Sequence, residues 1–212
     1  MVDLISLHRK RSMPYPGPVM AEVQSTFRLK RGDPAPSFEL PDHEGRSFSL
    51  GGLRGEKGAL VIFACNHCPF VIHLASAIGR FAEELAASGI ATVAIMPNDV
   101  ENYPDDHPDK MGPFAAASGW NFPYLYDETQ EVAKAWGAAC TPDFFLLDAE
   151  GRLFYAGQFD SSRPKNDEAV SGGDLRGATT ALLAGEEAPG AVYPSSGCNI
   201  KWKAGNEPPY FG

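Results

Sequence analysis

The chain has 212 residues, of which 43% are hydrophobic and 21% are charged, and these proportions are ordinary for a globular protein. Its length suits one domain with extensions and allows a substantial core. The net charge of −9 argues against nucleic acid as a partner, because phosphate binding depends largely on basic side chains. No stretch approaches the roughly 18 apolar residues of a membrane span, so no membrane partner is expected either.

The N-terminal segment carries basic residues at positions 8–11 but no apolar core after them, unlike a secretory signal peptide. We therefore expect a cytoplasmic protein. Residues 1–31 are predicted to form an N-terminal arm that is partly disordered, and Met20 offers a second plausible start. A single α/β domain is predicted over residues 32–185. Residues 186–212 are rich in Pro and Gly and are expected to form a tail packed on that domain.

The first half of the domain shows alternating strands and one helix. Residues 34–40 and 47–50 flank a turn and predict an N-terminal β-hairpin. Residues 58–64 are an unbroken apolar run typical of a strand buried on both faces. Apolar residues then recur with helical spacing from Phe70 to Leu85, and a second buried strand covers residues 90–96. Strand, helix and strand predict a right-handed βαβ unit.

The second half continues with helices around residues 110–118 and from Asp127, where Asp-x-x-Gln is a capping pattern. Residues 144–147 and 153–156 flank a turn and predict a second hairpin. A last helix is predicted over residues 173–184. This order of elements predicts a central mixed β-sheet with helices on both faces.

Two cysteines, Cys65 and Cys68, stand at the junction between the first buried strand and the helix after it. Near a helix N-terminus, free backbone N–H groups and the helix dipole favour a thiolate, and we expect this effect at Cys65. Two neighbouring cysteines, one of which ionises readily, are the minimum equipment for thiol–disulfide exchange. In a chain of this length, four cysteines do not indicate a disulfide-stapled scaffold.

Several spaced motifs resemble the AhpC/TSA (redoxin) and TlpA-like branch of the thioredoxin superfamily. They are residues 32–40, Gly45, Leu50, the Cys-x-x-Cys, residues 122–127, Thr141-Pro142, and Asp148 with Gly151. Together they cover roughly residues 32–185. The Cys-Asn-His-Cys-Pro centre and the tail residues 197–203 also resemble one subgroup of thioredoxin-family proteins without an assigned activity. The resemblance implies a thioredoxin-like fold and a thiol–disulfide oxidoreductase.

The resemblance also implies roles for individual residues. Cys65 would be the exposed attacking thiol and Cys68 the more buried resolving thiol, so that the Cys65–Cys68 disulfide replaces any cofactor. Thr141 and Pro142 resemble the cis-proline loop that offers backbone groups to a bound peptide. This loop is expected to line the substrate groove, together with Asn66 and Pro69. The partners would be protein or low-molecular-weight thiols and disulfides; the oligomeric state is not predicted.

His67 stands between the two cysteines and is counted with the catalytic residues. An imidazole beside the thiolate stabilises the reduced form and raises the reduction potential. Oxidoreductases with His in this slot have potentials about 90 to 150 mV above that of thioredoxin. We therefore expect a centre more oxidising than thioredoxin; the alternative is an exposed residue at the helix start.

Three alternatives remain at this stage. A peroxiredoxin-like thiol peroxidase would fit the family, but the Pro-x-x-x-Thr-x-x-Cys pattern that orients peroxide is absent before either cysteine. A Cys-ligated metal protein is the second, with Cys140 and Cys198 as further ligands. A structural zinc site usually shows a second close cysteine pair, and this chain has none, so no metal is predicted. A redox-inactive docking module is the third, against which the intact Cys-x-x-Cys argues.

Cys140 and Cys198 are candidates for additional thiols, or small buried hydrophobic residues. Thioredoxin carries a buried acid six residues before its first cysteine, where this chain has Ala59, so the proton acceptor for Cys68 is not predicted. The acidic residues between positions 99 and 109 lack the spacing of a calcium loop, and a solvated connection is expected there.

Overall fold

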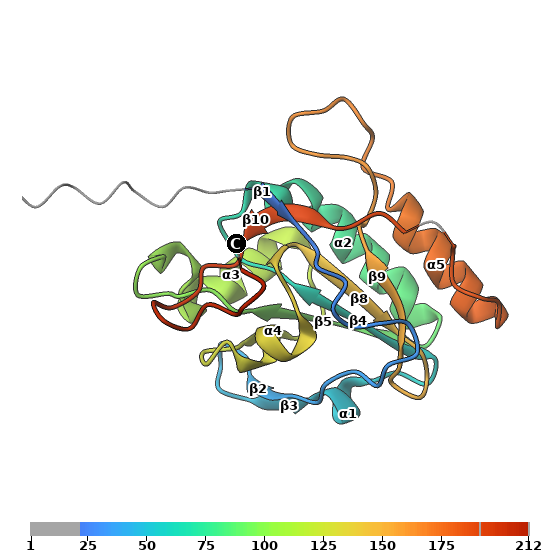
Figure 1. Cartoon of the computed structure of the whole chain (residues 1–212), viewed down its shortest axis with the longest axis horizontal. Helices are drawn as coiled ribbons and strands as arrows, with labels where there is room; N and C mark the ends of the chain where they lie inside the picture. Colours follow the sequence, from blue (N-terminus) through green and yellow to red (C-terminus); the bar gives the residue numbers. More distant parts are fainter. Residues whose placement is uncertain (1–21, 191, 212) are drawn as a thin grey trace, which may run out of the picture.

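The computed structural model describes residues 22–190 and 192–211, so the predictions for residues 1–21 lie outside the described part. A five-stranded sheet forms the centre, in the order β6-β5-β4-β8-β9 (Figure 1). These strands are Tyr124–Tyr126, Ile90–Met96, Gly58–Phe63, Asp143–Leu147 and Leu153–Gly157. β4, β5 and β6 are parallel, whereas β8 and β9 are antiparallel to their neighbours. The predicted mixed sheet is confirmed.

β4 is the central strand, and all six of its residues are buried. Because successive side chains of a strand point to opposite faces, β4 contributes to two separate apolar clusters. Leu60 and Ile62 belong to the cluster on one face, and Val61 and Phe63 to the cluster on the other. The continuous apolar run in the sequence is therefore explained by helices on both faces of the sheet.

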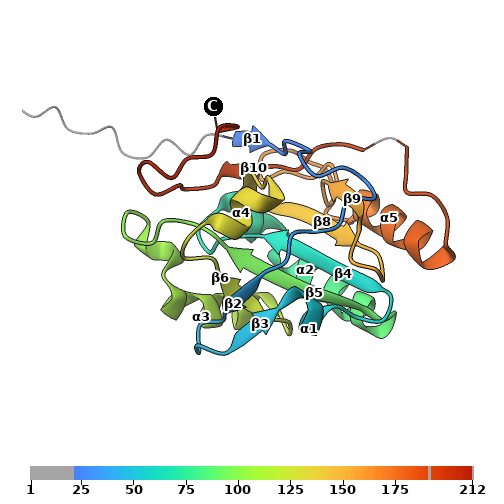
Figure 2. The ribbon, with the colours of Figure 1, turned by 60° about the horizontal axis from the view of Figure 1, so that its bottom comes forward.

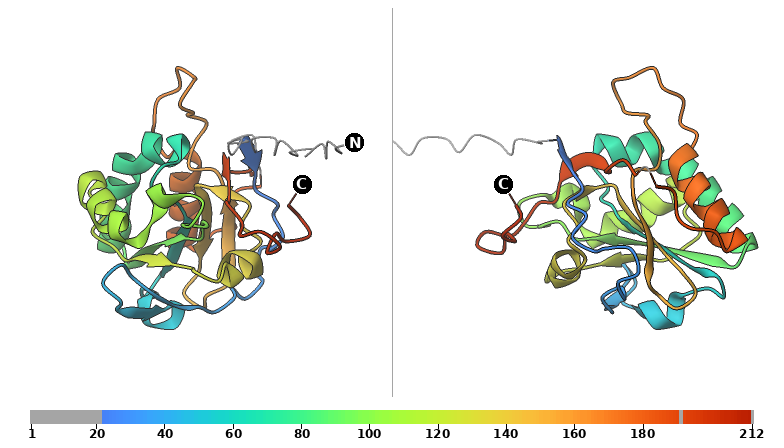
Figure 3. Two further views of the ribbon diagram at one scale, coloured as in Figure 1. Left: turned by 90° about the vertical axis from the view of Figure 1, so that its left-hand side faces the viewer. Right: turned by 45° about the vertical axis from the view of Figure 1, so that its right-hand side comes forward.

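The helices divide between the two faces. The first cluster includes residues of α2 (Pro69–Ala87), α3 (Pro108–Ser118) and α5 (Gly173–Ala184). The second includes residues of α1 (Leu50–Leu53), of α4 (Glu131–Trp136) and of the hairpin β2 (Glu39–Pro41) and β3 (Ser47–Ser49). Figure 3 shows α2 and α3 on the side of the molecule opposite α4. Among the described residues, no helix is long and apolar enough to cross a membrane.

Both predicted hairpins and the last helix are confirmed, but α4 begins later than predicted. Its N-cap is Gln130, which has a left-handed φ of 64°. The carboxylate of Asp127 accepts the backbone N–H of Ala133 at 2.8 Å. The Gln130 amide instead donates to the backbone carbonyls of Pro97 and Lys201, at 2.7 and 2.9 Å. Asp127 therefore accepts an N–H group of the first helical turn, but the helix begins at Glu131 and the predicted capping box with Asp127 as N-cap does not form.

A second, three-stranded sheet joins distant parts of the chain in the order β1-β10-β7 (Figures 1 and 2). Its strands are Glu22–Gln24, Ser196–Asn199 and Cys140–Thr141, and both pairings are antiparallel. β1 belongs to the predicted N-terminal arm and β10 to the predicted tail. The short strand β7 lies directly before Pro142, so this sheet brings the tail to the loop that faces the cysteines.

Candidate functional site

The two cysteines lie where β4 ends and α2 begins. Cys65 follows β4 by two positions, and Cys68 is the N-cap residue of α2, whose first residue is Pro69. Proline suits this position because its missing N–H would have no partner in the first helical turn. Cys65 and Cys68 are only 1% and 0% exposed. The resemblance implied an exposed Cys65, whereas in this structure both thiols are closed to solvent.

Thr141 contacts both sulfur atoms from the opposite side. The Thr141–Pro142 peptide bond is cis, which confirms the prediction for this loop. The hydroxyl Oγ1 of Thr141 lies 3.4 Å from Sγ of Cys65. The carbonyl oxygen of Thr141 lies 3.0 Å from Sγ of Cys68, which donates to it when protonated. Of the predicted groove residues, Thr141 thus stands directly against the cysteine pair, and Pro142 follows it across the cis bond.

Burial raises the pKa of the Cys65 thiol well above its usual value, and the hydrogen bond with Cys68 adds to this effect. The pKa of Cys68 is lowered: burial acts in the opposite direction, but hydrogen bonds with Cys198 and Cys65 outweigh it. The backbone N–H of Val71 also contributes a hydrogen bond that lowers it. The helix begins one residue after Cys68, so its free N–H groups favour a thiolate there and not at Cys65, where the sequence placed it.

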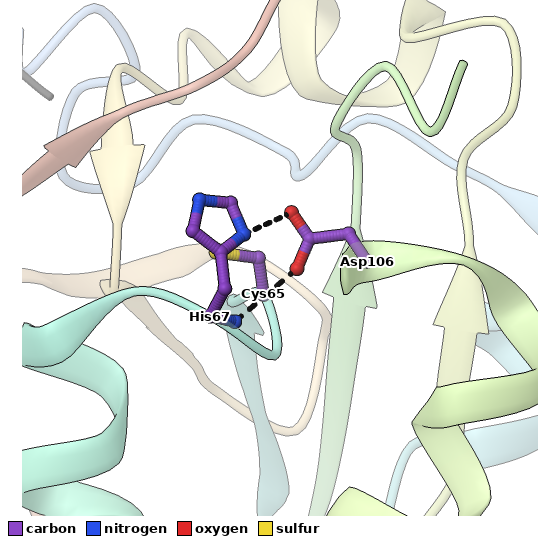
Figure 4. A group of neighbouring side chains, drawn as sticks. All are labelled: Cys65, His67 and Asp106. Carbon is purple, nitrogen blue, oxygen red and sulfur yellow. Dashed lines mark hydrogen bonds and ion pairs between the residues drawn. The ribbon is translucent and has the colours of Figure 1, made fainter. Parts of the chain in front are cut away.

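Asp106 is the residue that organises the loop between the cysteines. It ends the short 3₁₀ helix Pro104–Asp106 and is fully buried. Its Oδ1 accepts the backbone N–H groups of Asn66 and His67 at 2.8 and 3.3 Å. Its Oδ2 lies 2.7 Å from Nδ1 of His67 (Figure 4). The same oxygen accepts the Asn98 amide at 2.8 Å. One carboxylate therefore fixes both the backbone and the imidazole of the segment between the cysteines.

The His67 ring is turned toward Asp106, and its side chain is 19% exposed. The hydrogen bond to Asp106 raises the pKa of His67, although burial acts against this shift. The ring stacks on Tyr103, with centroids 6.0 Å apart and planes 10° apart. The ammonium of Lys201 lies 5.7 Å from the centroid of Tyr103, and its charge lowers the pKa of His67. His67 is thus a positioned side chain and not a freely exposed residue at the helix start.

The other two predicted groove residues differ in their surroundings. Asn66 is half-buried: its Oδ1 accepts the hydroxyl of Tyr124 at 3.1 Å, and its Nδ2 donates to the carbonyl of Asp105 at 3.2 Å. Burial raises the pKa of Tyr124 well above its usual value, so the phenol stays a donor. Pro69 is exposed. Asn66 therefore braces the loop, and Pro69 lies at the surface beside the cysteines.

Of the two additional cysteines, Cys198 lies close to Cys65 and Cys68, whereas the Cys140 thiol contacts backbone carbonyl groups. Cys198 pairs with Thr141 in the small sheet and is buried in the same apolar cluster as Cys68, whose pKa it lowers through a hydrogen bond. Cys140 is buried with its thiol 3.5 Å from the carbonyl oxygen of Pro142, and burial raises its pKa well above the usual value. Of the two additional thiols, the structure brings Cys198 to the centre.

One group of three metal-ligating side chains comes together within the described residues: Cys65, His67 and Asp106. One ligand atom from each lies within 4.8 Å of the others. Cys68, Cys140 and Cys198, which the metal alternative would use, are not part of this group. Nδ1 of His67 already faces the carboxylate of Asp106. Two of the three groups therefore pair with each other beside the Cys65 thiol.

Asp106 was missed at the level of sequence, where residues 99–109 were expected to be solvated. Asp99 and Asp106 are in fact 3% and 0% exposed. A usable signal existed, because the carboxyl ends of the parallel strands β4 and β5 meet at one edge of the sheet. An acidic segment that follows β5 must lie near the Cys-x-x-Cys that follows β4. Which of its carboxylates turns inward could not be told from spacing.

The chain belongs to the Redoxin family, whose model matches residues 30–172. A putative peroxiredoxin of Mycobacterium tuberculosis is 34% identical over 146 residues, covering 63% of this chain and 88% of the relative. Peroxiredoxin Bcp of Escherichia coli is 27% identical over 154 residues, covering 67% and 92% respectively. The fold, the cis-proline loop and the cysteine pair therefore belong to a redoxin of the thioredoxin superfamily.

Among solved structures, a hypothetical protein from Sinorhizobium meliloti is 47% identical, with a TM-score of 0.83 over 86% of this chain and 99% of that one. A putative thiol:disulfide interchange protein from Chlorobium tepidum is 22% identical, with a TM-score of 0.57 over 73% and 99%. The first similarity extends to sequence and structure. The second shows the thioredoxin-like fold alone.

Proposed function

We propose that the protein is a thiol–disulfide oxidoreductase in which Cys65 and Cys68 form the redox-active disulfide. The observation that carries this proposal is that one residue, Thr141, lies against both buried thiols at the start of α2, 3.4 Å from Sγ of Cys65 through its hydroxyl and 3.0 Å from Sγ of Cys68 through its carbonyl oxygen. Membership of the Redoxin family supports it. The functional unit would be residues 32–185, with residues 186–212 as an associated tail.

In the reductive direction, the Cys65 thiolate attacks a partner disulfide, forming a mixed disulfide and releasing one partner thiolate. Cys68 then attacks Sγ of Cys65, which forms the Cys65–Cys68 disulfide and releases the second partner thiolate. The partner gains two electrons, and the cysteine pair loses two. Because the two sulfur atoms share a hydrogen bond, the negative charge favoured at Cys68 can pass to Cys65 as the proton moves the other way.

His67 and Asp106 set the charge beside this pair. The raised pKa of His67 favours an imidazolium, which stabilises a thiolate and hence the reduced form. The charge of Asp106 acts in the opposite sense, because it raises the pKa of Cys65. We propose that the imidazolium makes the centre more oxidising than thioredoxin. His67→Ala should then lower its midpoint potential, whereas an unchanged potential would remove this role.

The partners would be protein or low-molecular-weight thiols and disulfides, in a cytoplasmic setting. The chain's own cysteines supply the redox group, so the reaction needs no separate cofactor. Because Cys65 is 1% exposed, a partner reaches it only when the loop of residues 65–68 or the tail strand moves. All four thiols should accordingly react slowly with an alkylating reagent in the native, reduced protein.

A redox titration in dithiothreitol buffers tests the proposal, with thiols trapped by alkylation and located by peptide mass spectrometry. Cys65 and Cys68 share the tryptic peptide 58–80, so their disulfide appears as one internally linked peptide. With an external disulfide probe, Cys68→Ser should trap a mixed disulfide at Cys65. Cys65→Ser should trap none at Cys68 with the same probe. No Cys65–Cys68 disulfide at any poise would sink the proposal and make metal analysis of the purified protein the next step.

Thiol peroxidase activity is a second candidate because both curated relatives are named as peroxiredoxins. The hydroxyl of Thr141 stands 3.4 Å from Sγ of Cys65, although it comes from the cis-proline loop and not from the usual motif. Peroxide would convert the Cys65 thiolate to a sulfenic acid, and Cys68 would then form the disulfide with loss of water. Peroxide consumption with dithiothreitol, absent in Cys65→Ser, would establish this activity.

A further inference from the structure

The tail strand β10 occupies the edge of the strand that leads into the cis-proline loop. Cys198 pairs with Thr141 and Asn199 with Cys140 in antiparallel register. An extended peptide that adds to such an edge gains its affinity from the same backbone hydrogen bonds. The position expected for a partner's strand is thus filled by the chain itself (Figure 1).

The fit of this strand is close. A Cβ atom on Gly197 would lie 2.1 Å from the carbonyl oxygen of Thr141, so only glycine allows β10 this approach. Immediately after the strand, Ile200 is fully buried, and the backbone N–H of Lys201 donates to Oδ1 of Asn98 at 2.9 Å. The strand is therefore anchored on the domain from its C-terminal side, and Cys198 is held at a fixed place beside the centre.

Cys198 is 3% exposed and belongs to the same apolar cluster as Cys65 and Cys68. We propose that Cys198 is a third redox thiol that exchanges with Cys68, so that β10 serves as a built-in partner strand. This inference rests on the proposed function, since it uses the same cysteine pair. It assigns the protein two disulfide states, Cys65–Cys68 and Cys68–Cys198.

The exchange is balanced without any outside oxidant once the first disulfide exists. The Cys198 thiolate attacks Sγ of Cys68, the Cys68–Cys198 bond forms, and the Cys65–Cys68 bond breaks. The electron pair of the broken bond stays on Cys65, which takes up the proton that Cys198 has lost. The result is a free Cys65 thiol, while Cys68 is held in a disulfide with Cys198. In this state only Cys65 can react with a new partner.

Oxidation of Cys68 removes one obstacle to the ionisation of Cys198. In the dithiol, the hydrogen bond with Cys68, burial and the negative charge of Cys68 all raise the pKa of Cys198. A disulfide at Cys68 carries no negative charge, so burial still raises this pKa while the ammonium of Lys201 lowers it. That ammonium is fixed at 2.9 Å from the carbonyl oxygen of Asn199 and 2.7 Å from its side-chain oxygen.

The geometry of Cys140 excludes it as the exchanging thiol, so it can serve as a control. Its thiol lies 3.5 and 3.9 Å from the carbonyl oxygens of Pro142 and Ser195, so it is engaged with the backbone. It neighbours Thr141 on the same strand, and alternating side chains of a strand point to opposite faces. Cys140 therefore points away from the side on which Thr141 meets Cys65.

The test uses double variants in the full chain. Cys65→Ser with Cys140→Ser leaves Cys68 and Cys198, which lie on the separate tryptic peptides 58–80 and 177–201. Oxidation at a poise that fully oxidises the wild type should join these two peptides in most molecules. The matched control, Cys65→Ser with Cys198→Ser, leaves Cys68 and Cys140 and should stay reduced, without a link between peptides 58–80 and 135–152.

The oxidised wild-type protein provides a second measurement that does not depend on the folding of a variant. A fraction of its molecules should carry the cross-link between peptides 58–80 and 177–201. Two results together would overturn the inference. The Cys65→Ser, Cys140→Ser variant would be natively folded but as reduced as the control, and the oxidised wild type would show no such cross-link. If the wild type still formed the Cys65–Cys68 disulfide, the proposed function would survive that result. A Cys68–Cys198 disulfide without any Cys65–Cys68 disulfide would reject the proposed function and the exchange step that starts from it, although Cys198 would still be shown to pair with Cys68.

Discussion

Nδ1 of His67 lies 2.7 Å from Oδ2 of Asp106, and this contact joins the loop between the cysteines to the segment after β5. The carboxylate is fully buried, and it also accepts two backbone N–H groups and the Asn98 amide. It therefore fixes the backbone and the imidazole of the centre together. Hydrogen bonds to a buried charged group are among the strongest in proteins, so the geometry of the centre depends on this single carboxylate.

Asp106→Asn should lower the pKa of His67, because the hydrogen bond that raises it is weakened. It should also lower the pKa of Cys65, on which the charge of Asp106 acts. Titration of the His67 ring by NMR measures the first effect, and the pH dependence of Cys65 alkylation measures the second. Asp105→Asn is the matched control, since Asp105 is exposed and pairs with Lys110. Equal shifts in both variants would contradict the role given to Asp106.

Thr141→Val should raise the pKa of Cys65, because the hydroxyl of Thr141 forms a hydrogen bond that lowers it. Alkylation of Cys65 at neutral pH should become slower. Thr92→Val serves as the control, since the Thr92 hydroxyl is buried without a hydrogen-bond partner. That substitution should leave alkylation unchanged and stabilise the fold by about 1 kcal/mol, because an unsatisfied buried group is removed. A faster reaction in Thr141→Val would refute the expectation.

Asp143 should make stability depend on pH in the mildly acidic range. Burial raises its pKa from 3.8 to about 6, although the Ser25 hydroxyl donates to it. A carboxyl group whose pKa is raised by folding contributes stability that is fully present below its unfolded pKa and is lost as pH rises from there to about 6. The shift corresponds to about 3 kcal/mol. Wild-type urea midpoints should therefore fall between about pH 4 and about pH 6.

Asp143→Asn carries no titrating group at this position and should show a smaller fall over the same range. His67, whose pKa is also raised, contributes a loss of stability in the same direction as pH rises. It is present in both proteins, so the difference between their two curves isolates Asp143. Parallel curves for the two proteins would show that burial of Asp143 does not act in this way.

Gly197→Ala should displace β10, because its Cβ would lie 2.1 Å from the Thr141 carbonyl oxygen. We expect a loss of about 1–3 kcal/mol, as for other overpacked sites, and faster alkylation of Cys68 and Cys198 in the native protein. Gly177→Ala is the control: this helical glycine has open space where the Cβ would stand, so stability should rise by about 0.5–1 kcal/mol. Unchanged thiol reactivity in Gly197→Ala would mean that β10 does not close the site.

The central sheet could be predicted because its signals are local. β4 is a continuous apolar run, β5 is apolar except for Thr92, and the helix predicted over residues 173–184 has the bounds of α5. The cysteine pair was likewise recognisable from its spacing, and the cis-proline loop from its resemblance to the thioredoxin superfamily. The small sheet could not be foreseen, because β1, β7 and β10 are two to four residues long and draw their pairing from distant segments.

The same reason explains what was missed at the site. Asp106 and Cys198 reach the centre through the tertiary fold, 38 or more residues from Cys68 along the chain (106 − 68). Spacing within one segment gives no information on such contacts. The burial of Cys65 likewise depends on tertiary contacts, among them that with Thr141, which lies 76 residues further along the chain. Residues that pair across the fold were therefore found only in the structure.

The antiparallel pairing of β10 with β7 has a consequence for the chain during its synthesis. Cys140 and Ser195 are separated by 55 residues, so β7, Cys65 and Cys68 are synthesised well before the strand that pairs with β7. At bacterial and eukaryotic elongation rates, this interval is about 3 to 11 s. Throughout it, β7 has no β10 to pair with, and the two thiols lack the tail that packs beside them. The enzyme is therefore most open to oxidation, and to non-native strand pairing, before its own translation has reached β10.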